Sequence, residues 1–413
     1  MKYGLIGEKL SHSFSPEIHG MLGDYEYELT EIAPDSLKEF MESAPFKGIN
    51  VTIPYKSAVM PYLTWIDGKA KEIGAVNTVV NRGGRLYGYN TDFYGLKALL
   101  KRIGANPKGN KTLILGTGGT SKTAMAVVKD MGGEEVYKVS RSGADGAITY
   151  EEAVKYHGDS AVIINTTPSG MYPNVDSCPI DLKAFPKLQA VADVVYNPLR
   201  TRLVQTATEM GIPAEGGLYM LVAQAVAASQ HFFAVSYDES IVDKIYKRLL
   251  RSKENIVLIG MPSSGKSTVG GVLAKEYGKP LADTDKMIEA AVGMKIPDIF
   301  AEKGEAYFRD RETEAVKSAS VGGGKTIATG GGAVLREENV KALRQNGRLY
   351  FLDRPMELLC PTGDRPLTSN TSALEKIYNE RYGIYTKAAD VRIENDKTPE
   401  EAAELIMKEL YGE

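Results

Sequence analysis

Two glycine-rich turns in the 413-residue sequence have the composition of phosphate-binding loops. Residues 111–124 are KTLILGTGGTSKTA and residues 255–270 are NIVLIGMPSSGKSTVG, so in both an apolar run precedes the glycines and small residues follow them. A strand that ends in such a turn and leads into a helix offers unpaired N–H groups and a positive dipole end to an anion. The sequence therefore predicts two nucleotide sites.

The second turn fits the pattern G-x-x-x-x-G-K-[ST], preceded by the apolar strand that this pattern requires. Its backbone amides would surround a phosphate, Lys266 would place a charge at the phosphate oxygens, and Ser267 could ligate Mg²⁺. The predicted ATP-binding residues are Gly260, Ser263, Ser264, Gly265, Lys266, Ser267 and Thr268.

Polar residues downstream of this turn could hold a metal and a substrate. Asp283 and Asp285 form an Asp-x-Asp pair whose carboxylates would project together from a strand end, although a surface turn is an equal alternative. Arg309 and Glu312 fall on one helical face, where Arg309 could bind a substrate carboxylate or pair only with Glu312. Three successive glycines, at positions 330–332, would let a ligand approach the backbone closely.

The first part of the chain contains groups suited to reducing a ketone. Lys56 with Asp92 could supply a proton, as an ammonium held beside a carboxylate. The hydroxyls of Ser13 and Ser15 could bind a carboxylate, although a helix cap is the commoner use of such serines. The four histidines are His12, His19, His157 and His231, and we assign the first two a structural role.

The strand after the first glycine turn indicates which dinucleotide binds there. That strand ends at Val139 and is followed by Ser140, Arg141 and Ser142, rather than by the acidic residue that would bond a ribose 2′-hydroxyl. An arginine between serines suits a 2′-phosphate, so the sequence favours NADPH. The residues predicted to bind the pyrophosphate are Gly116, Thr117, Gly118, Gly119 and Thr120.

Strand-like and helix-like segments alternate along the chain, which is typical of parallel α/β sheets. The strands expected in the first part are residues 3–6, 48–53, 76–80, 135–139, 161–165 and 191–195, and those in the second part are residues 256–259, 326–329 and 348–352. A charged helical segment over residues 243–254 would join the two parts, and residues 399–413 would form an amphipathic closing helix.

The composition excludes several classes of protein. With 43% hydrophobic and 25% charged residues, a net charge of −3 and a pI near 6.0, the chain is neither disordered nor a general nucleic-acid binder. Its two cysteines, each beside a proline, argue against disulfides and cysteine metal sites. We expect no membrane helix and no signal peptide, and therefore a cytoplasmic protein.

The motifs GMPSSGKST, ADTD, GEAYFRDRE, ATGGGAV, DRPL and NERYGIY, in this order over residues 255–413, resemble shikimate kinase. The resemblance implies that Ser267 and Asp283 hold Mg²⁺, that Asp285 activates the attacking hydroxyl, and that Arg365 stabilises charge during transfer. It further implies that the shikimate is bound by Asp285, Arg309, Gly330, Gly331, Gly332 and Arg381. The segment ELLCPTGD carries no arginine ahead of Arg365, where the family is expected to have another basic residue.

The motifs SHSFSPEIH, NVTIPYK, AVNTV, GYNTD, LGTGGTSKTA, INTTPSGM, DVVYNP and GGLYMLVAQA resemble shikimate dehydrogenase. The resemblance implies that Lys56 and Asp92 form the catalytic pair. It also implies that the substrate contacts Ser13, Ser15, Thr52, Asn77, Asp92 and Gln224, and that Tyr196 and Gly217 close the site beside the nicotinamide. Lys122 stands where many relatives have arginine.

Together the two resemblances imply a bifunctional enzyme of chorismate and aromatic amino-acid biosynthesis. Its substrates would be 3-dehydroshikimate and shikimate, its cofactors NADP(H), ATP and Mg²⁺, with no nucleic-acid partner. The alternative is a quinate/shikimate dehydrogenase with relaxed cofactor use, fused to a kinase domain that is weak or only binds ligand.

The expected fold is α/β throughout. A dehydrogenase would occupy residues 1–250, with an α/β substrate lobe over about 1–95 and 217–250 and a Rossmann NADP lobe over about 96–216. A linker over residues 251–254 would precede a P-loop domain at 255–413, a three-layer α/β domain similar to nucleoside monophosphate kinases. The sequence leaves the oligomeric state open.

Overall fold

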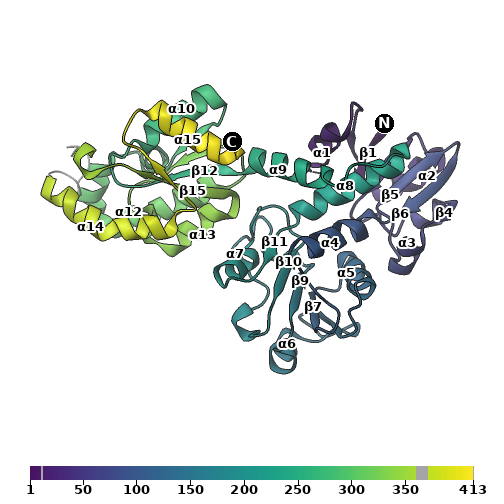
Figure 1. Cartoon of the computed structure of the whole chain (residues 1–413). Coiled ribbons are helices and arrows are strands. Elements are labelled where there is room, and N and C mark those ends of the chain that lie inside the picture. Colours follow the sequence, from purple (N-terminus) through teal and green to yellow (C-terminus); the bar gives the residue numbers. More distant parts are fainter. Residues whose placement is uncertain (11–12, 360–370, 413) are drawn as a thin grey trace. The chain divides into compact units, whose positions relative to one another are not determined.

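The structure is a computed structural model that describes residues 1–10, 13–359 and 371–412. It divides into two compact units, Met1–Leu249 and Leu250–Glu413 (Figure 1). The division falls within helix α9 (Ile241–Lys253), and strand β12 (Asn255–Ile259) begins two residues after that helix ends. The predicted linker at 251–254 is therefore helical through Lys253, because buried apolar residues at helical spacing continue the helix to its charged end.

The first unit contains a six-stranded mixed sheet in the order β2-β1-β3-β5-β6-β4. Its strands β1, β2 and β3 pair in parallel, whereas β3, β5 and β6 pair antiparallel. The elements of this lobe are β1 (Tyr3–Gly7), α1 (Ser15–Leu22), β2 (Glu28–Glu31), α2 (Leu37–Ser43), β3 (Gly48–Val51), β4 (Trp65–Ile66), α3 (Gly68–Ile73), β5 (Thr78–Arg82), β6 (Arg85–Tyr89), α4 (Thr91–Arg102) and α8 (Leu218–Phe233).

Helix α8 brings a distant part of the chain back to this lobe, where it packs along α4 and also contacts α1 (Figure 1). The close approach to α4 requires Gly95, because a Cβ there would lie 2.6 Å from the carbonyl oxygen of Met220. Most of α8 is apolar and buried, which explains why the helix needs partners on more than one face.

The second sheet of this unit is entirely parallel, in the order β11-β10-β9-β7-β8. Its central strands are short runs of buried apolar residues, as expected for a parallel sheet covered on both faces. The elements are β7 (Thr112–Leu115), α5 (Gly119–Asp130), β8 (Val136–Val139), α6 (Tyr150–His157), β9 (Val162–Asn165), β10 (Ala190–Asp193), α7 (Arg202–Glu209) and β11 (Ala214–Glu215).

The second unit is a parallel sheet in the order β13-β14-β12-β15-β16, covered on both faces. Ile256 and Leu258 pack against α10 and α15, whereas Val257 and Ile259 pack into the core on the opposite face, so three layers form. The remaining elements are α10 (Lys266–Tyr277), β13 (Leu281–Asp283), α11 (Thr284–Val292), α12 (Ile296–Ser320), β14 (Thr326–Ala328), α13 (Glu337–Asn346), β15 (Gly347–Asp353), α14 (Thr371–Ala388), β16 (Val391–Glu394) and α15 (Pro399–Tyr411).

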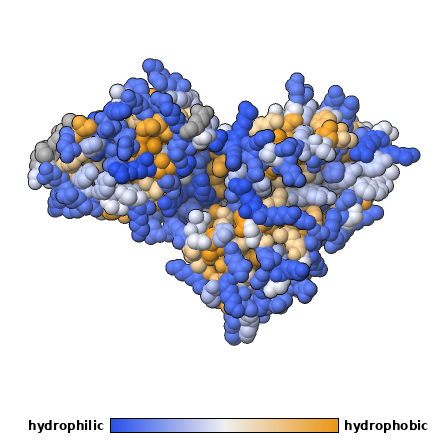
Figure 2. All heavy atoms as spheres, in the orientation of Figure 1, coloured by the Kyte–Doolittle hydropathy of each residue, from blue (hydrophilic) through white to orange (hydrophobic). Residues whose placement is uncertain are grey.

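Hydrophilic residues cover most of the face shown in Figure 2, with apolar residues gathered in smaller patches. Within residues 1–10, 13–359 and 371–412, every helix is too short or too polar to span a lipid bilayer.

Candidate functional site

The first unit places Lys56 beside Asp92, with 2.6 Å between Nζ and Oδ2. Lys56 follows β3, and its carbonyl accepts a hydrogen bond from the N–H of Val76 at 2.7 Å. Asp92 lies in the first turn of α4, where the Asn90 side chain caps the helix. The Lys56 and Asp92 side chains are 27% and 15% exposed, so the pair is largely shielded yet reachable by a ligand.

Asn77 is held beside this pair with a defined orientation. Its Oδ1 accepts hydrogen bonds from the Thr91 N–H at 2.6 Å, from Thr91 Oγ1 at 3.2 Å and from Thr78 Oγ1 at 3.2 Å. Because the oxygen is fully used, the amide's N–H₂ is the end that remains for a ligand. Thr91 Oγ1 also lies 3.4 Å from Gln224 Oε1, which connects α4 with α8.

Buried polar side chains hold Thr78, the neighbour of Asn77, in place. Tyr27 Oη donates to Asn50 Oδ1 at 2.7 Å, and Asn50 Nδ2 donates to Thr78 Oγ1 at 3.0 Å. The His19 ring stacks on Tyr27 at 3.9 Å, and burial lowers its pKa to about 3, so the ring is neutral. His19 therefore has the structural role predicted for it, whereas His12 lies outside the described residues.

Of the two predicted carboxylate-binding serines, Ser13 lies just before α1 and Ser15 is its first residue, and neither is the N-cap. The helix N-cap is Phe14, with no capping hydrogen bond from its side chain, and Ser13 Oγ accepts from the Ser15 N–H at 3.2 Å. The Phe14 ring meets Tyr196 edge-on at 5.5 Å, which brings this segment next to a residue of the other lobe. Thr52 is half-buried just past β3.

The loop after β7 fits a dinucleotide phosphate. Gly116 has a φ of +111°, and a Cβ at Gly118 or Gly119 would meet nothing within 4 Å, so there is open space beside the backbone at these two glycines for a ligand. Thr117 is exposed and Thr120 is half-buried.

The neighbouring loop after β8 carries the residues predicted for the 2′-phosphate. The Ser140 hydroxyl accepts from the Gly143 N–H at 3.1 Å, while Arg141 and Ser142 are exposed. Next to the chain just past the end of β10, Gly217 cannot be replaced without displacement, because a Cβ there would lie 2.1 Å from the Val194 carbonyl oxygen.

Asp193, at the end of β10, organises this lobe and is not singled out by the sequence analysis. Its carboxylate accepts hydrogen bonds from Asn165 Nδ2 at 3.0 Å, from the Val195 N–H at 3.0 Å and from Thr201 Oγ1 at 2.7 Å. Burial raises the pKa of Asp193 to about 7. The only signal in the sequence is its place in the DVVYNP motif.

In the second unit, the glycine turn wraps around its own lysine. Lys266 Nζ donates to the carbonyls of Gly260 at 2.9 Å and Met261 at 2.7 Å. Ser263 and Gly265 adopt φ values of +64° and +85°, which the tight turn requires. The Ser263 Oγ is buried with no hydrogen-bond partner among the described residues, so this donor fits a phosphate oxygen.

Ser267, Asp283 and Asp285 come together, although not as predicted. Asp283 ends β13 and caps α11, accepting from the N–H groups of Asp285 and Lys286 at 3.1 and 3.2 Å. The two aspartates are therefore not alternate residues of one strand, because the chain turns into a helix between them. Ser267 Oγ donates to Asp283 Oδ2 at 2.6 Å.

This serine and aspartate suit Mg²⁺, which usually keeps several waters and takes few protein ligands. In the described part of the chain, no group of three histidine, cysteine or carboxylate side chains is placed to hold a metal alone.

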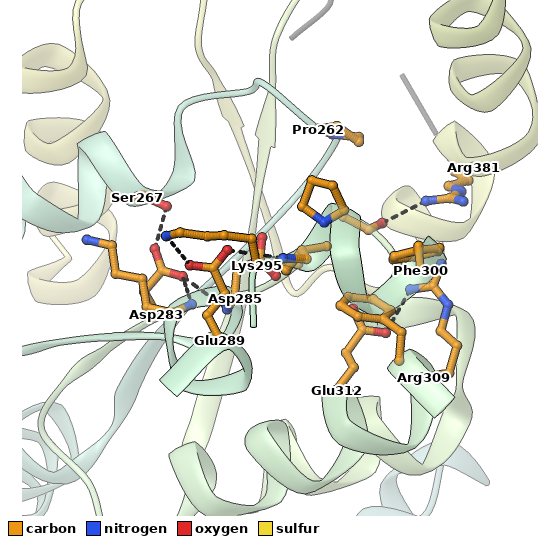
Figure 3. Close-up of a pocket in the computed structure, with 17 residues that line it drawn as sticks. Pro262, Ser267, Asp283, Asp285, Glu289, Lys295, Phe300, Arg309, Glu312 and Arg381 are labelled. Atoms are coloured by element: carbon orange, nitrogen blue, oxygen red, sulfur yellow. Dashed lines mark hydrogen bonds and ion pairs between the residues drawn. The ribbon is translucent and has the colours of Figure 1, made fainter. Parts of the chain in front are cut away.

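A cavity of about 480 Å³ lies next to these residues. Figure 3 shows Asp283, Asp285 and Glu289 toward one end of it and Arg309 and Arg381 toward the other. Eight predicted residues line it, namely Ser267, Asp283, Asp285, Arg309, Gly330, Gly331, Gly332 and Arg381. The others are Pro262, Lys286, Glu289, Lys295, Ile296, Pro297, Phe300, Phe308 and Glu312. Most of these lie on α11 and the start of α12, where sequence alone does not separate a cavity wall from core.

Arg309 forms the ion pair with Glu312 that one interpretation of the sequence expected, while its role in binding a substrate carboxylate stays a prediction. Its guanidinium pairs with Glu312 at 2.8 Å and with Glu305 at 3.0 Å, and it also faces the cavity. Burial raises the pKa of Glu312 against the opposing effect of Arg309. The Oε1 of Glu312 is buried without a partner among the described residues, so it can accept from a ligand hydroxyl.

The three glycines pack tightly against these side chains. A Cβ at Gly332 would lie 2.0 Å from Arg309 Nη1, and a Cβ at Gly330 would lie 2.7 Å from Asp285 Oδ1. The carbonyl of Gly331 accepts from Arg381 Nη1 at 3.3 Å and from Tyr385 Oη at 2.5 Å.

Two further residues of the kinase domain differ from those above, one because it was not predicted and one because it is not described. Tyr385 contacts Gly331 across 54 residues of sequence, and its only signal in the sequence is its place at the end of the NERYGIY motif. Arg365 and the segment around it lie outside the described residues, so its predicted role in ATP binding and transfer stays a prediction.

Comparisons with known proteins agree with this arrangement. Residues 5–79 match the family model of the shikimate dehydrogenase substrate binding domain. A shikimate dehydrogenase (NADP(+)) of Clostridium beijerinckii is 39% identical over 261 residues, which span 59% of this chain and 96% of the relative. The chain belongs to the shikimate dehydrogenase family. In addition, residues 262–411 match the family model of shikimate kinase, so this member joins the two families in one polypeptide, as predicted.

Solved structures support the dehydrogenase fold. A chorismate mutase/shikimate 5-dehydrogenase fusion protein from Clostridium acetobutylicum has a TM-score of 0.57 at 38% identity, covering 60% of this chain and 96% of that one. Shikimate 5-dehydrogenase from Thermus thermophilus, solved with NADP(H) and shikimate, has a TM-score of 0.54 at 29% identity, covering 60% and 99%. The predicted α/β architecture of the first unit is confirmed.

Proposed function

We propose that the chain reduces 3-dehydroshikimate to shikimate with NADPH and then phosphorylates the 3-hydroxyl of shikimate with ATP. The observation that carries the proposal is the presence, in one chain, of the Lys56–Asp92 contact and of a cavity polarised between Asp285 and Arg309. We assign the reduction to residues 1–250 and the phosphorylation to residues 255–413. The protein would act in the cytoplasm on these small molecules.

In the reduction, Lys56 is the proton donor. Bound NADPH supplies the hydride, and the carbonyl oxygen of the substrate becomes an alkoxide that must gain a proton. The Lys56 ammonium provides it, and Asp92 holds the ammonium in place at 2.6 Å. Asn77 presents its N–H₂ to a substrate oxygen, while Ser13 and Ser15 bind the substrate carboxylate.

In the phosphorylation, the two ends of the cavity orient shikimate. Arg309 and Arg381 bind the carboxylate, because a guanidinium can contact both of its oxygens. The ring hydroxyl then meets Asp285, which accepts its proton. Lys266 and the loop amides hold the phosphates of ATP, while Ser267 and Asp283 hold Mg²⁺, which neutralises charge on them. Catalysis rests on positioning and electrostatics.

The exposed Arg141 supports NADPH over the alternative of a quinate/shikimate dehydrogenase with relaxed cofactor use. The alternative of a kinase domain that only binds ligand is disfavoured by the complete set of Lys266, Ser267, Asp283, Asp285 and Arg309.

One incubation tests both activities. The purified chain, mixed with 3-dehydroshikimate, NADPH, MgCl₂ and ATP, should yield shikimate 3-phosphate, identified by mass. Lys56→Ala should abolish the reduction and leave phosphorylation of added shikimate near normal, and Lys266→Ala should do the reverse. If the wild-type chain accumulates shikimate, the kinase assignment is wrong. If either variant loses both activities while folded, the assignment of two independent sites is wrong.

A further inference from the structure

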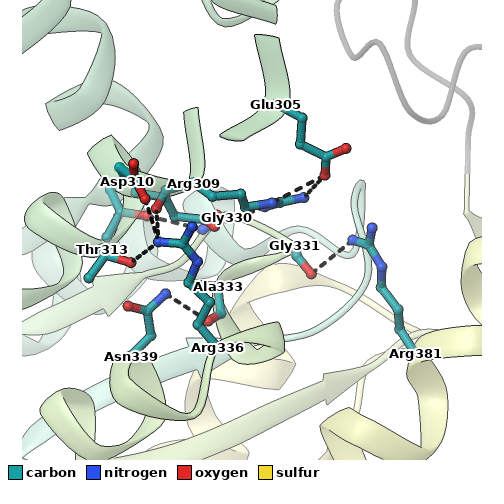
Figure 4. A network of polar contacts seen from close by, with 12 residues as sticks. Glu305, Arg309, Asp310, Thr313, Gly330, Gly331, Ala333, Arg336, Asn339 and Arg381 are labelled. Atoms are coloured by element: carbon teal, nitrogen blue, oxygen red, sulfur yellow. Dashed lines mark hydrogen bonds and ion pairs between the residues drawn. The ribbon is translucent and has the colours of Figure 1, made fainter. Parts of the chain in front are cut away.

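Arg336 connects two walls of the kinase cavity without being among the described residues that line it. It lies between the short 3-10 helix η4 (Ala333–Leu335) and α13. Its Nη1 donates to three oxygens of α12: the Arg309 carbonyl at 3.1 Å, Asp310 Oδ1 at 2.9 Å and Thr313 Oγ1 at 3.1 Å (Figure 4). One guanidinium therefore fastens the turn of α12 that carries Arg309.

These contacts differ in what they contribute. Asp310 is 62% exposed, so its ion pair with Arg336 is screened by water and contributes little. The carbonyl of Arg309 is a main-chain atom of the residue whose guanidinium faces the cavity. A charged donor on that carbonyl fixes the helical turn itself, and charge-assisted hydrogen bonds are the stronger class.

The same two segments also meet at the cavity surface. The guanidinium of Arg309 lies against Gly332, where a Cβ would be only 2.0 Å from Nη1. Four residues later, Arg336 holds the main chain of Arg309. The segment between the two contacts is itself anchored, because Asn339 Nδ2 donates to the Ala333 carbonyl at 2.9 Å. Arg309 is thus held against the glycine segment at both its main chain and its side chain.

We propose that Arg336 is a positioning residue for shikimate binding, which acts by setting the place of Arg309 relative to the glycine segment. The assignment rests on the kinase function proposed above. Loss of Arg336 would let the Arg309 turn shift away from Gly332, and the guanidinium would no longer meet the substrate carboxylate squarely.

The test is steady-state kinetics of Arg336→Gln in the full chain. The KM for shikimate should rise about tenfold, as expected when one charge-assisted hydrogen bond is weakened. The kcat and the KM for ATP should stay within about twofold. The substrate carboxylate is remote from the reacting hydroxyl, so its contact with Arg309 stabilises the bound substrate and the transition state equally, and weakening that contact changes only the KM for shikimate. Arg336→Lys, which keeps one charged donor, should restore part of the shikimate affinity.

The readout separates positioning from a general structural role. A merely structural arginine would lower the amount of active kinase, and hence the apparent kcat, without moving the KM for shikimate. The dehydrogenase activity of the same chain should be unchanged, which shows that the chain is correctly quantified, and the unchanged kcat of the kinase shows that the second unit is folded.

Two control variants sharpen the comparison. Arg348 is the matched arginine, because its side chain is 31% exposed, against 32% for Arg336, and it pairs with Glu409 and does not line the cavity. Arg348→Gln should therefore leave the KM for shikimate unchanged. Asp310→Asn should change that KM by less than about twofold, because only the exposed ion pair is lost.

An Arg336→Gln chain with the wild-type KM overturns this assignment alone. A wild-type chain that does not phosphorylate shikimate overturns the proposed kinase function with it.

Discussion

Replacing Gly332 with alanine should weaken shikimate binding while leaving the chain folded. The new Cβ would lie 2.0 Å from Nη1, 2.6 Å from Cζ and 2.7 Å from Nη2 of Arg309. Ordinary contact begins at 3.4 Å, so Nη1 must move by about 1.4 Å, the difference between 3.4 and 2.0. The backbone tolerates the change, because Gly332 has a φ of −100° that alanine adopts without strain.

The displaced group is the tip of a flexible side chain, so the cost falls on function rather than on folding. A hydrogen bond to a charged group contributes about 1.5–3 kcal/mol, which corresponds to a loss of about 10- to 150-fold in affinity. Steady-state kinetics should show this loss in the KM for shikimate, with the KM for ATP and the dehydrogenase activity preserved.

Gly271→Ala is the matched control. Gly271 lies in α10, and a Cβ added there would meet nothing within 4 Å, so alanine should leave both activities intact and favour the helix slightly. A Gly332→Ala chain whose KM for shikimate is within about twofold of the wild-type value would refute the placement of Arg309 against this glycine.

Three further outcomes follow from other residues. Arg141→Ala should raise the KM for NADPH about 10- to 100-fold, through a lost charged hydrogen bond, with little change for NADH; equal changes for both would contradict the 2′-phosphate role. The pKa of His19 is about 3 in the folded chain, against an ordinary value of 6.5, so between these pH values the unfolded chain binds more protons than the folded one. The free energy of unfolding therefore falls as the pH drops from about 6.5 toward 3. Asp193 has the opposite effect: its pKa is about 7 when folded and 3.8 ordinarily, so the folded chain binds more protons and stability falls as pH rises between them. Urea unfolding at several pH values measures the free energy of unfolding. For His19→Gln this free energy should depend less on pH on the acid side, and for Asp193→Asn it should fall less toward pH 7. A pH dependence like that of the wild type would count against the corresponding pKa shift.

Much of the fold follows from local patterns. All nine strands expected from apolar runs are present, among them residues 256–259 within β12 and residues 161–165 around β9. The antiparallel hairpin of β5 and β6 was not expected, because it is a departure from the strand and helix alternation that identifies parallel sheets. Short edge strands such as β4 and β16 carry too few apolar residues to stand out.

The candidate site was predictable where a motif holds its own residues together. The glycine turn around Lys266 is local, so a short run of consecutive residues defines it. Tyr385 belongs to the NERYGIY motif, but the motif does not indicate its contact with Gly331, and Arg336 lies outside every motif. Each acts on a segment far away in sequence, through a hydrogen bond to a main-chain carbonyl. A carbonyl is the same in every residue, so such partners leave no pattern of residue types to detect.

The two carboxylates on Arg309 make substrate binding an exchange of ligands. The guanidinium is already neutralised by Glu305 and Glu312 before any anion arrives. Glu305 is 56% exposed and returns to water at little cost, whereas Glu312 is 1% exposed and stays in place. If Arg309 binds the substrate carboxylate as proposed, that carboxylate would take the place of Glu305 in an exchange of one anion for another. Such a cavity would select for the shape and reach of a carboxylate more than for negative charge, because the charge of Arg309 is already neutralised.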